Sequence, residues 1–194
     1  MGRLTGPELK YRTKQALAGI IPIAGLVDHG PHLSSGSDIE LINAYSQKAS
    51  ERLHPYLFMS PTIVGSMVQR NLLPLSENAF KAILLDAAKA LKSLKIERLV
   101  IMSGSQKDLE VSESALGQLQ GKKIFLGIWQ FYPKIPELEG EDPLATGNPF
   151  LTAQMLYLNP TMVKQDMMKY ANASFGVSGD LKKATADIGK KIFE

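Results

Sequence analysis

The chain of 194 residues contains no cysteine, which excludes disulfides, thiolate nucleophiles and cysteine-ligated metals. It also lacks any apolar run of the roughly 18 residues that a membrane-spanning helix requires. Residues 1–16 carry four basic side chains with no long apolar run after them, unlike a signal peptide. We therefore expect a cytoplasmic protein without a membrane partner.

The chain also has little excess of charge of either sign, because its formal net charge is only +3. Lysines occur in pairs such as 122–123 and 190–191 rather than in a basic tract. A nucleic-acid face usually combines clustered Lys and Arg with stacking aromatics, so we expect no nucleic-acid partner. A hydrophobic content of 44% in a chain of this length suits one domain over residues 1–194 with a sizeable core.

Short apolar segments alternate with amphipathic ones along the chain. The alternation favours a mainly parallel α/β sheet with helices on both faces. The predicted strands are 17–24, 56–64 (limited by Pro61), 99–102 and 124–129, and the predicted helices are 38–53, 77–93 with Ser76 as N-cap, 109–120 ended by Gly121, 151–158, and a last helix capped by Asp180.

Ligands of such sheets bind beyond the carboxyl ends of the strands. Two predicted loops meet that condition, residues 25–38 and residues 103–108. The first contains His29, His32 and Asp38, and the second contains Ser105 and Lys107. These two loops are where we expect the chemistry of the protein.

The first loop resembles the opening motif of the creatininase family, a strand followed by G-S-x-E-x-H-G-P-H-L-P-x-x-T-D. The run His29 to Leu33 matches H-G-P-H-L, and Asp38 matches the final Asp. Residues 176–189, GVSGDLKKATADIG, resemble the family's later G-V-x-G-D-P-x-x-A-T-x-x-x-G. The resemblance therefore extends over most of the chain.

The resemblance implies a three-layer α/β/α domain, commonly assembled into a hexamer. It also implies metal-dependent hydrolysis of a C–N bond in a cyclic amide or formamide, with two zinc or manganese ions. Such an ion lowers the pKa of bound water towards about 7 and polarises the scissile carbonyl. His29 and Asp38 would be metal ligands, and His32 a supporting residue.

The chain departs from this pattern at several ligand positions. Val27 stands where the family has the ligand Glu, Ser105 where it has a ligand His, and Lys107 where some members have a further Glu. Around residues 145–152 the His and Glu of H-A-G-x-x-E-T-S are absent, although Gly147 matches. A catalytic site normally needs three protein ligands plus water, and only His29 and Asp38 remain.

Three readings stay open. In the first, the chain is a catalytically degenerate pseudoenzyme without a cofactor that keeps a ligand-binding or oligomer-scaffold role. In the second, His29 and Asp38 hold one zinc or manganese ion together with a loop acid from Glu137, Glu139 or Glu141. In the third, the chain is a metal-free enzyme with Ser103 or Ser105 as nucleophile and Lys107 as base.

Lys107 also suggests a substitute for the lost ions. A partly buried carboxylate is costly without a cation nearby, and an ammonium beside Asp38 would supply one. The joint presence of Val27, Ser105 and Lys107 motivates this hypothesis. If Lys107→Ala leaves stability and the pH profile of unfolding unchanged, the hypothesis is excluded.

Overall fold

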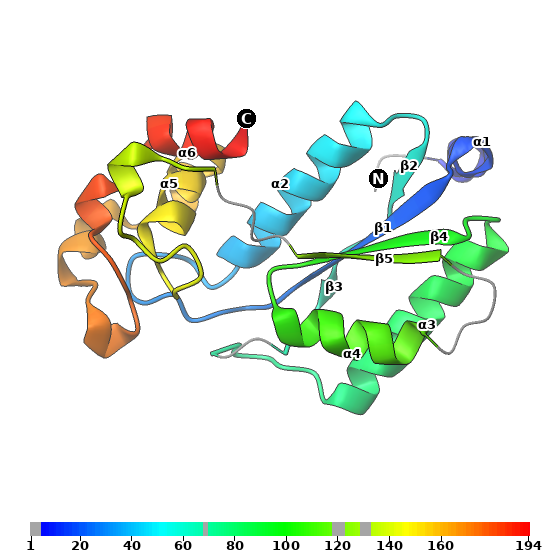
Figure 1. The fold of residues 1–194 in the computed structure, drawn as a ribbon, viewed down its shortest axis with the longest axis horizontal. Coiled ribbons are helices and arrows are strands. Elements are labelled where there is room, and N and C mark those ends of the chain that lie inside the picture. The colour runs from blue at the N-terminus through cyan, green and yellow to red at the C-terminus, as the bar shows by residue number, and fades with distance from the viewer. Residues whose placement is uncertain (1–4, 68–69, 118–122, 129–132) are drawn as a thin grey trace. The chain divides into compact units, whose positions relative to one another are not determined.

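The computed structural model describes residues 5–67, 70–117, 123–128 and 133–194, with only the backbone of 123–128. The chain forms two compact units (Figure 1). Unit 1 comprises Met1–Gly25 and Ile42–Trp129. Unit 2 comprises Leu26–Leu41 and Gln130–Glu194.

Unit 1 contains a parallel sheet of five strands in the order β2-β1-β4-β5, with β3 also paired to β1. The predicted parallel sheet is confirmed. The predicted strand 56–64 is instead two short strands, one on each side of Pro61. Trp129, the last residue of the predicted strand 124–129, lies outside the described residues. The strands are β1 Ala18–Ala24, β2 Leu57–Met59, β3 Ile63–Val64, β4 Arg98–Ser103 and β5 Lys123–Ile128.

Helices cover both faces of this sheet (Figure 1). On one face, α3 and α4 pack against each other. On the other, α2 is anchored by Ser46, whose Oγ donates a hydrogen bond to Met102 Sδ of β4 at 3.2 Å. The helices are α1 Gly6–Gln15, α2 Ser37–Arg52 (which begins in unit 2), α3 Glu77–Ser93 and α4 Gln106–Leu116.

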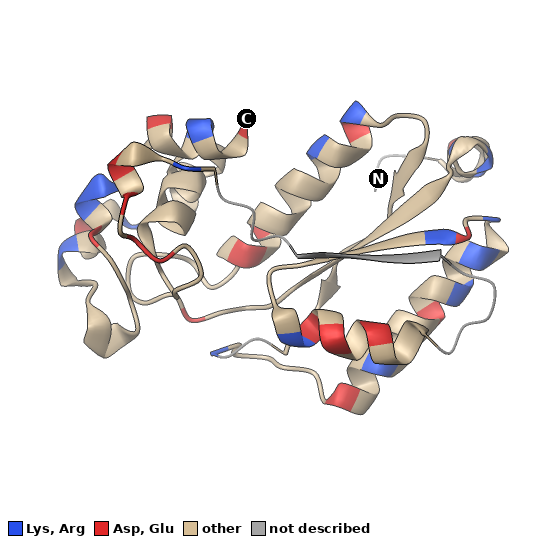
Figure 2. Ribbon diagram, viewed as in Figure 1, with Lys and Arg blue, Asp and Glu red and all other residues tan. Residues whose placement is uncertain are grey.

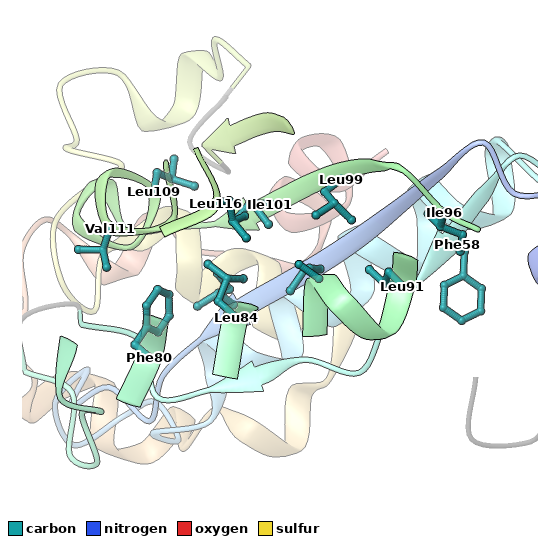
Figure 3. Close-up of a cluster of buried hydrophobic side chains, with 13 residues drawn as sticks. Phe58, Phe80, Leu84, Leu91, Ile96, Leu99, Ile101, Leu109, Val111 and Leu116 are labelled. Atoms are coloured by element: carbon teal, nitrogen blue, oxygen red, sulfur yellow. The ribbon is translucent and has the colours of Figure 1, made fainter. Parts of the chain in front are cut away.

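The core of unit 1 is formed by buried side chains of the sheet and of helices α3 and α4 (Figure 3). Alternate residues of a strand point to one face of the sheet, and Ile21 and Ile101 thereby join the cluster that α3 lines with Phe80 and Leu84. Ser76 caps α3 as predicted, accepting a hydrogen bond from Ala79 N at 3.3 Å. Ile83 of the same helix is 43% exposed and does not belong to this cluster.

Helix α4 differs from its predicted range of 109–120. It begins three residues earlier because Ser105 is its N-cap, with Oγ accepting a hydrogen bond from Asp108 N at 3.3 Å. It ends at Leu116, with Gly117 as C-cap. The predicted end at Gly121 was therefore wrong, and residues 118–122 lie outside the described residues.

Helix α3 carries charged side chains of both signs, whereas the charged residues of α4 after Lys107 are all acidic (Figure 2). On α3, Lys81 pairs with Glu77 at 2.7 Å and Lys89 with Asp86 at 3.0 Å. These exposed pairs contribute little to stability. No helix among the described residues is long and apolar enough to cross a membrane.

Unit 2 is built around two helices that lie side by side, α5 Pro149–Leu158 and α6 Ala186–Phe193 (Figure 1). Phe150, Ala153 and Ile188 belong to the buried cluster between them and the preceding loop. The remaining described segments include short 3-10 turns, namely η1 Pro136–Leu138, η2 Pro160–Met162, η3 Gln165–Tyr170, η4 Ala173–Phe175 and η5 Leu181–Lys183.

The last helix begins later than predicted. Asp180 caps only the 3-10 turn η5, where its Oδ1 accepts a hydrogen bond from Lys182 N at 3.0 Å. Thr185 is the N-cap of α6, with Oγ1 accepting from Ile188 N at 3.2 Å. Two capping residues five positions apart compete in the sequence, and the second starts the longer helix.

Candidate functional site

His29 and Asp38 form a hydrogen-bonded pair in unit 2. Asp38 lies in the first turn of α2, and His29 in the loop that follows β1. The atoms His29 Nε2 and Asp38 Oδ1 are 3.0 Å apart, with the His29 side chain 6% exposed and the Asp38 side chain 30% exposed. The fold thus brings together two of the residues that the motif singled out.

The backbone of Gly147 fixes which nitrogen of His29 carries the proton. Gly147 N donates a hydrogen bond to His29 Nδ1 at 3.3 Å, so Nδ1 must present its lone pair. A neutral imidazole has one N–H and one lone pair, which places the proton on Nε2. His29 is therefore the donor to Asp38, and both of its nitrogens are occupied.

His32 is fully buried beside this pair. Thr152 Oγ1 donates to Asn148 O at 2.9 Å and lies 3.0 Å from His32 Nε2, so His32 Nε2 donates to the hydroxyl. His32 Nδ1 has no hydrogen-bond partner among the described residues. Burial is the main cause that lowers the pKa of His32 to about 4, with a smaller electrostatic contribution from His29. His32 is thus neutral at pH 7, which fits the supporting role that the resemblance implies.

This low pKa predicts an acid-sensitive fold. Between about pH 6.5 and pH 4 the unfolded chain binds a proton at His32 that the folded chain does not. The free energy of unfolding should therefore fall by about 3 kcal/mol as pH drops through this window, at 1.36 kcal/mol per pKa unit. Urea unfolding at several pH values measures the slope.

Variants separate the contribution of His32 from that of other groups. His32→Gln should flatten the slope between pH 6.5 and pH 4, whatever it does to absolute stability. His54→Gln changes an exposed histidine and should leave the slope as it is. Equal slopes in His32→Gln and the unchanged protein would contradict the assignment.

The other acidic candidates of unit 2 are paired with lysines or exposed. Glu141 pairs with Lys183 at 2.6 Å, Glu137 pairs with Lys191 at 2.5 Å, and Glu139 is exposed. Val27, at the position of the family's ligand Glu, is a buried apolar side chain. No group of three His, Cys, Asp or Glu side chains that could hold a metal exists among the described residues. The donor set therefore does not fit the two-ion centre that the resemblance implies.

The serine candidates of unit 1 belong to a different arrangement. Ser103 Oγ donates to Asp108 Oδ2 at 2.8 Å and accepts from Ser105 N at 3.1 Å. Ser105 Oγ is used as the cap of α4. Lys107 is exposed. The hydrogen bond and the charge of Lys81 lower the pKa of Glu77, and the charge of Lys107 adds a smaller contribution. These hydrogen bonds do not support a Ser–Lys nucleophile and base.

Asp108 is the residue that the sequence reasoning missed. Its carboxylate is fully buried and accepts hydrogen bonds from Ser66 Oγ, Ser103 Oγ and Met67 N, the last at 2.7 Å. The spacing of Ser105 and Asp108 is typical of a helix start, and that signal would have placed the start of α4 correctly. It would not have revealed Ser66, which is 42 residues away.

Lys107 belongs to unit 1 and Asp38 to unit 2. The hypothesis that the Lys107 ammonium replaces a metal beside Asp38 therefore stays a prediction. His29, His32 and Asp38 are the candidate ligand-binding residues that one unit contains together.

Fold and sequence motif together define an α/β protein whose His–Asp pair follows the first strand of a parallel sheet. A family model described as creatininase, creatinine amidohydrolase, matches residues 2–194. The chain therefore belongs to the creatininase family. No curated protein matched the sequence.

Solved creatininase structures have the same fold. A structure described as creatininase with Mn shares 18% identity with this chain at a TM-score of 0.79. The match covers 100% of this chain and 92% of the creatininase chain. A crystal structure of creatinine amidohydrolase shares 19% identity at a TM-score of 0.78, covering 100% and 91%. A crystal structure described as a putative creatinine amidohydrolase from Bacteroides fragilis shares 16% identity at a TM-score of 0.70, covering 92% and 85%.

Proposed function

We propose that this creatininase-family protein has lost metal-dependent hydrolysis and uses His29 and Asp38 to bind a small molecule. The hydrogen bonding of His29 carries the proposal. Its Nδ1 accepts from Gly147 N and its Nε2 donates to Asp38 Oδ1. A metal-bound imidazole needs a lone pair directed at the ion, and here the lone pair is directed at an amide.

The chemistry of Asp38 indicates the class of ligand. Its side chain is 30% exposed and one oxygen accepts from His29. An ionised carboxylate only accepts hydrogen bonds. The ligand therefore carries N–H donors or a positive charge, as amidines, guanidines and protonated amines do.

An active hydrolase is the second candidate function. The chain keeps the H-G-P-H-L run and Asp38, and relatives of its fold include a creatininase with Mn. In this reading His29 and Asp38 hold one zinc or manganese ion with a loop acid, and the substrate is a small cyclic amide or formamide. Because Glu141 and Glu137 pair with lysines, Glu139 is the loop acid that this second function uses.

Metal stoichiometry tests the two functions against each other. The purified protein is incubated with zinc or manganese, desalted, and its bound ions are counted per chain, with Asp38→Ala as control. We expect no retained ion in either protein. About one ion per chain, lost in Asp38→Ala, would contradict the proposal and justify assays with cyclic amides and formamides.

Ligand binding is then measured directly. Isothermal titration with guanidinium and amidinium compounds should give heat with the unchanged protein and none with Asp38→Asn, which removes the negative charge but keeps the shape. Equal binding by both proteins would place the ligand elsewhere. We also propose that the chain forms a homo-oligomer, as the family resemblance suggests, and that it is cytoplasmic. Light scattering measures the assembly.

A further inference from the structure

The amide that contacts His29 belongs to a glycine that no other residue could replace. Gly147 has φ +59, a left-handed conformation that favours glycine. A Cβ at this position would lie 2.5 Å from the carbonyl oxygen of His29. The close approach of the two backbones is what lets Gly147 N reach His29 Nδ1.

The loop before Gly147 is held by the side chain of Asn148. Its Nδ2 donates hydrogen bonds to Pro143 O at 3.0 Å and to Ala145 O. Its Oδ1 accepts from Leu151 N at 2.8 Å and so caps α5. The carboxamide is 3% exposed. A single side chain thus ties the turn 143–147 to the start of α5.

Residues 178–183 also hold this loop in place. Glu141 accepts from Lys183 Nζ at 2.6 Å and from Asp180 N at 3.2 Å. Ser178 N donates to Thr146 O at 3.3 Å. A Cβ on Gly179 would lie 2.2 Å from Glu141 Oε2, so this glycine leaves room for the carboxylate.

We propose that Gly147, Asn148 and Glu141 are positioning residues that keep His29 in its Nε2–H tautomer. The Gly147 amide sets the tautomer, and Asn148 and Glu141 hold the loop that carries the amide. His29 then acts only as a hydrogen-bond donor to Asp38. The inference deepens the proposed function and rests on it for the role of the pair in binding a ligand.

Side-chain nitrogen NMR tests the proposal on the full chain. Long-range proton–nitrogen spectra at pH 8, above the ordinary histidine pKa of about 6.5, show which imidazole nitrogen carries the proton. His29 is assigned by the signals that disappear in His29→Gln. We expect protonated Nε2 and unprotonated Nδ1, with no detectable Nδ1–H form.

Asn148→Asp separates the loop contact from the helix cap. The aspartate still accepts from Leu151 N but has no N–H for Pro143 O and Ala145 O, so the loop loses its tie while the cap remains. We expect the Nδ1–H form of His29 to become detectable. If this variant fails to fold, Glu141→Gln provides a second test, because it weakens the contacts to Lys183 and Asp180 N.

Glu137→Gln is the matched control. It removes an ion pair of the same kind in the same loop region, with Lys191 at 2.5 Å. Unlike Glu141, Glu137 makes this ion pair with a residue outside 178–183. We expect its His29 spectrum to equal that of the unchanged protein. An Nδ1–H tautomer in the unchanged protein, or an unaltered tautomer in folded Asn148→Asp and Glu141→Gln, would overturn the inference. Retained metal in the unchanged protein would instead contradict the proposed function.

Discussion

Asp108→Ala should lower the free energy of unfolding by about 3 kcal/mol or more. The substitution leaves Ser66 Oγ, Ser103 Oγ and Met67 N without their acceptor, and each buried donor left unpaired costs roughly 1–3 kcal/mol. It also removes a negative charge from the first turn of α4, where the helix dipole favours one. Urea unfolding followed by circular dichroism measures the loss.

Two further variants show whether the hydrogen bonds are the cause. Asp108→Asn keeps the shape and one acceptor oxygen, so its loss should be intermediate. Glu110→Ala changes an exposed acid of the same helix, and we expect a change within about 0.5 kcal/mol. A loss below 1 kcal/mol in Asp108→Ala would mean that the serines and the amide find other partners at little cost.

Gly189→Ala should destabilise unit 2 although alanine is the better helix former. Helix propensity alone predicts a gain of about 1 kcal/mol. A Cβ on Gly189, however, would lie 1.9 Å from the carbonyl oxygen of Ala153 in α5. The backbone of α5 cannot move away without separating the two helices, so we expect a net loss of about 3 kcal/mol, the upper part of the usual overpacking range.

Gly104→Ala is the control for this prediction. A Cβ on Gly104 meets nothing within 4 Å, and we expect a change within about 0.5 kcal/mol. Thermal unfolding of both variants compares the two sites. A higher midpoint in Gly189→Ala would show that helix propensity outweighs the close approach of α5 and α6. Gly189 is also the last residue of the motif 176–189, and the helix contact gives a physical reason for a glycine there.

Family membership could be predicted because it depends on a few residues with distinct chemistry. The run from His29 to Leu33 and the glycines of 176–189 indicated the creatininase family, and the family model confirmed it over residues 2–194. Helix α3 was predicted with its bounds and cap because Ser76 and the apolar periodicity agree. The predicted starts of α4 and α6 were wrong because Ser105 and Thr185 act as N-caps, and several serines and threonines offered the same local signal. The predicted end of α4 was wrong because Gly117, and not Gly121, follows its last residue.

The sequence by itself determined the parallel α/β architecture, since short, nearly continuous apolar runs alternate with amphipathic segments that have a period of 3.6. It also determined that His29 and Asp38 are the remaining ligand-type residues of the motif. Only the tertiary structure shows which groups these two residues contact. His29 Nδ1 accepts a hydrogen bond from the amide of Gly147, 118 residues away, and Asp108 accepts one from a serine 42 residues away. Hydrogen bonds between distant segments leave no periodic trace in a sequence, because they depend on where the backbone folds and not on the residue types alone.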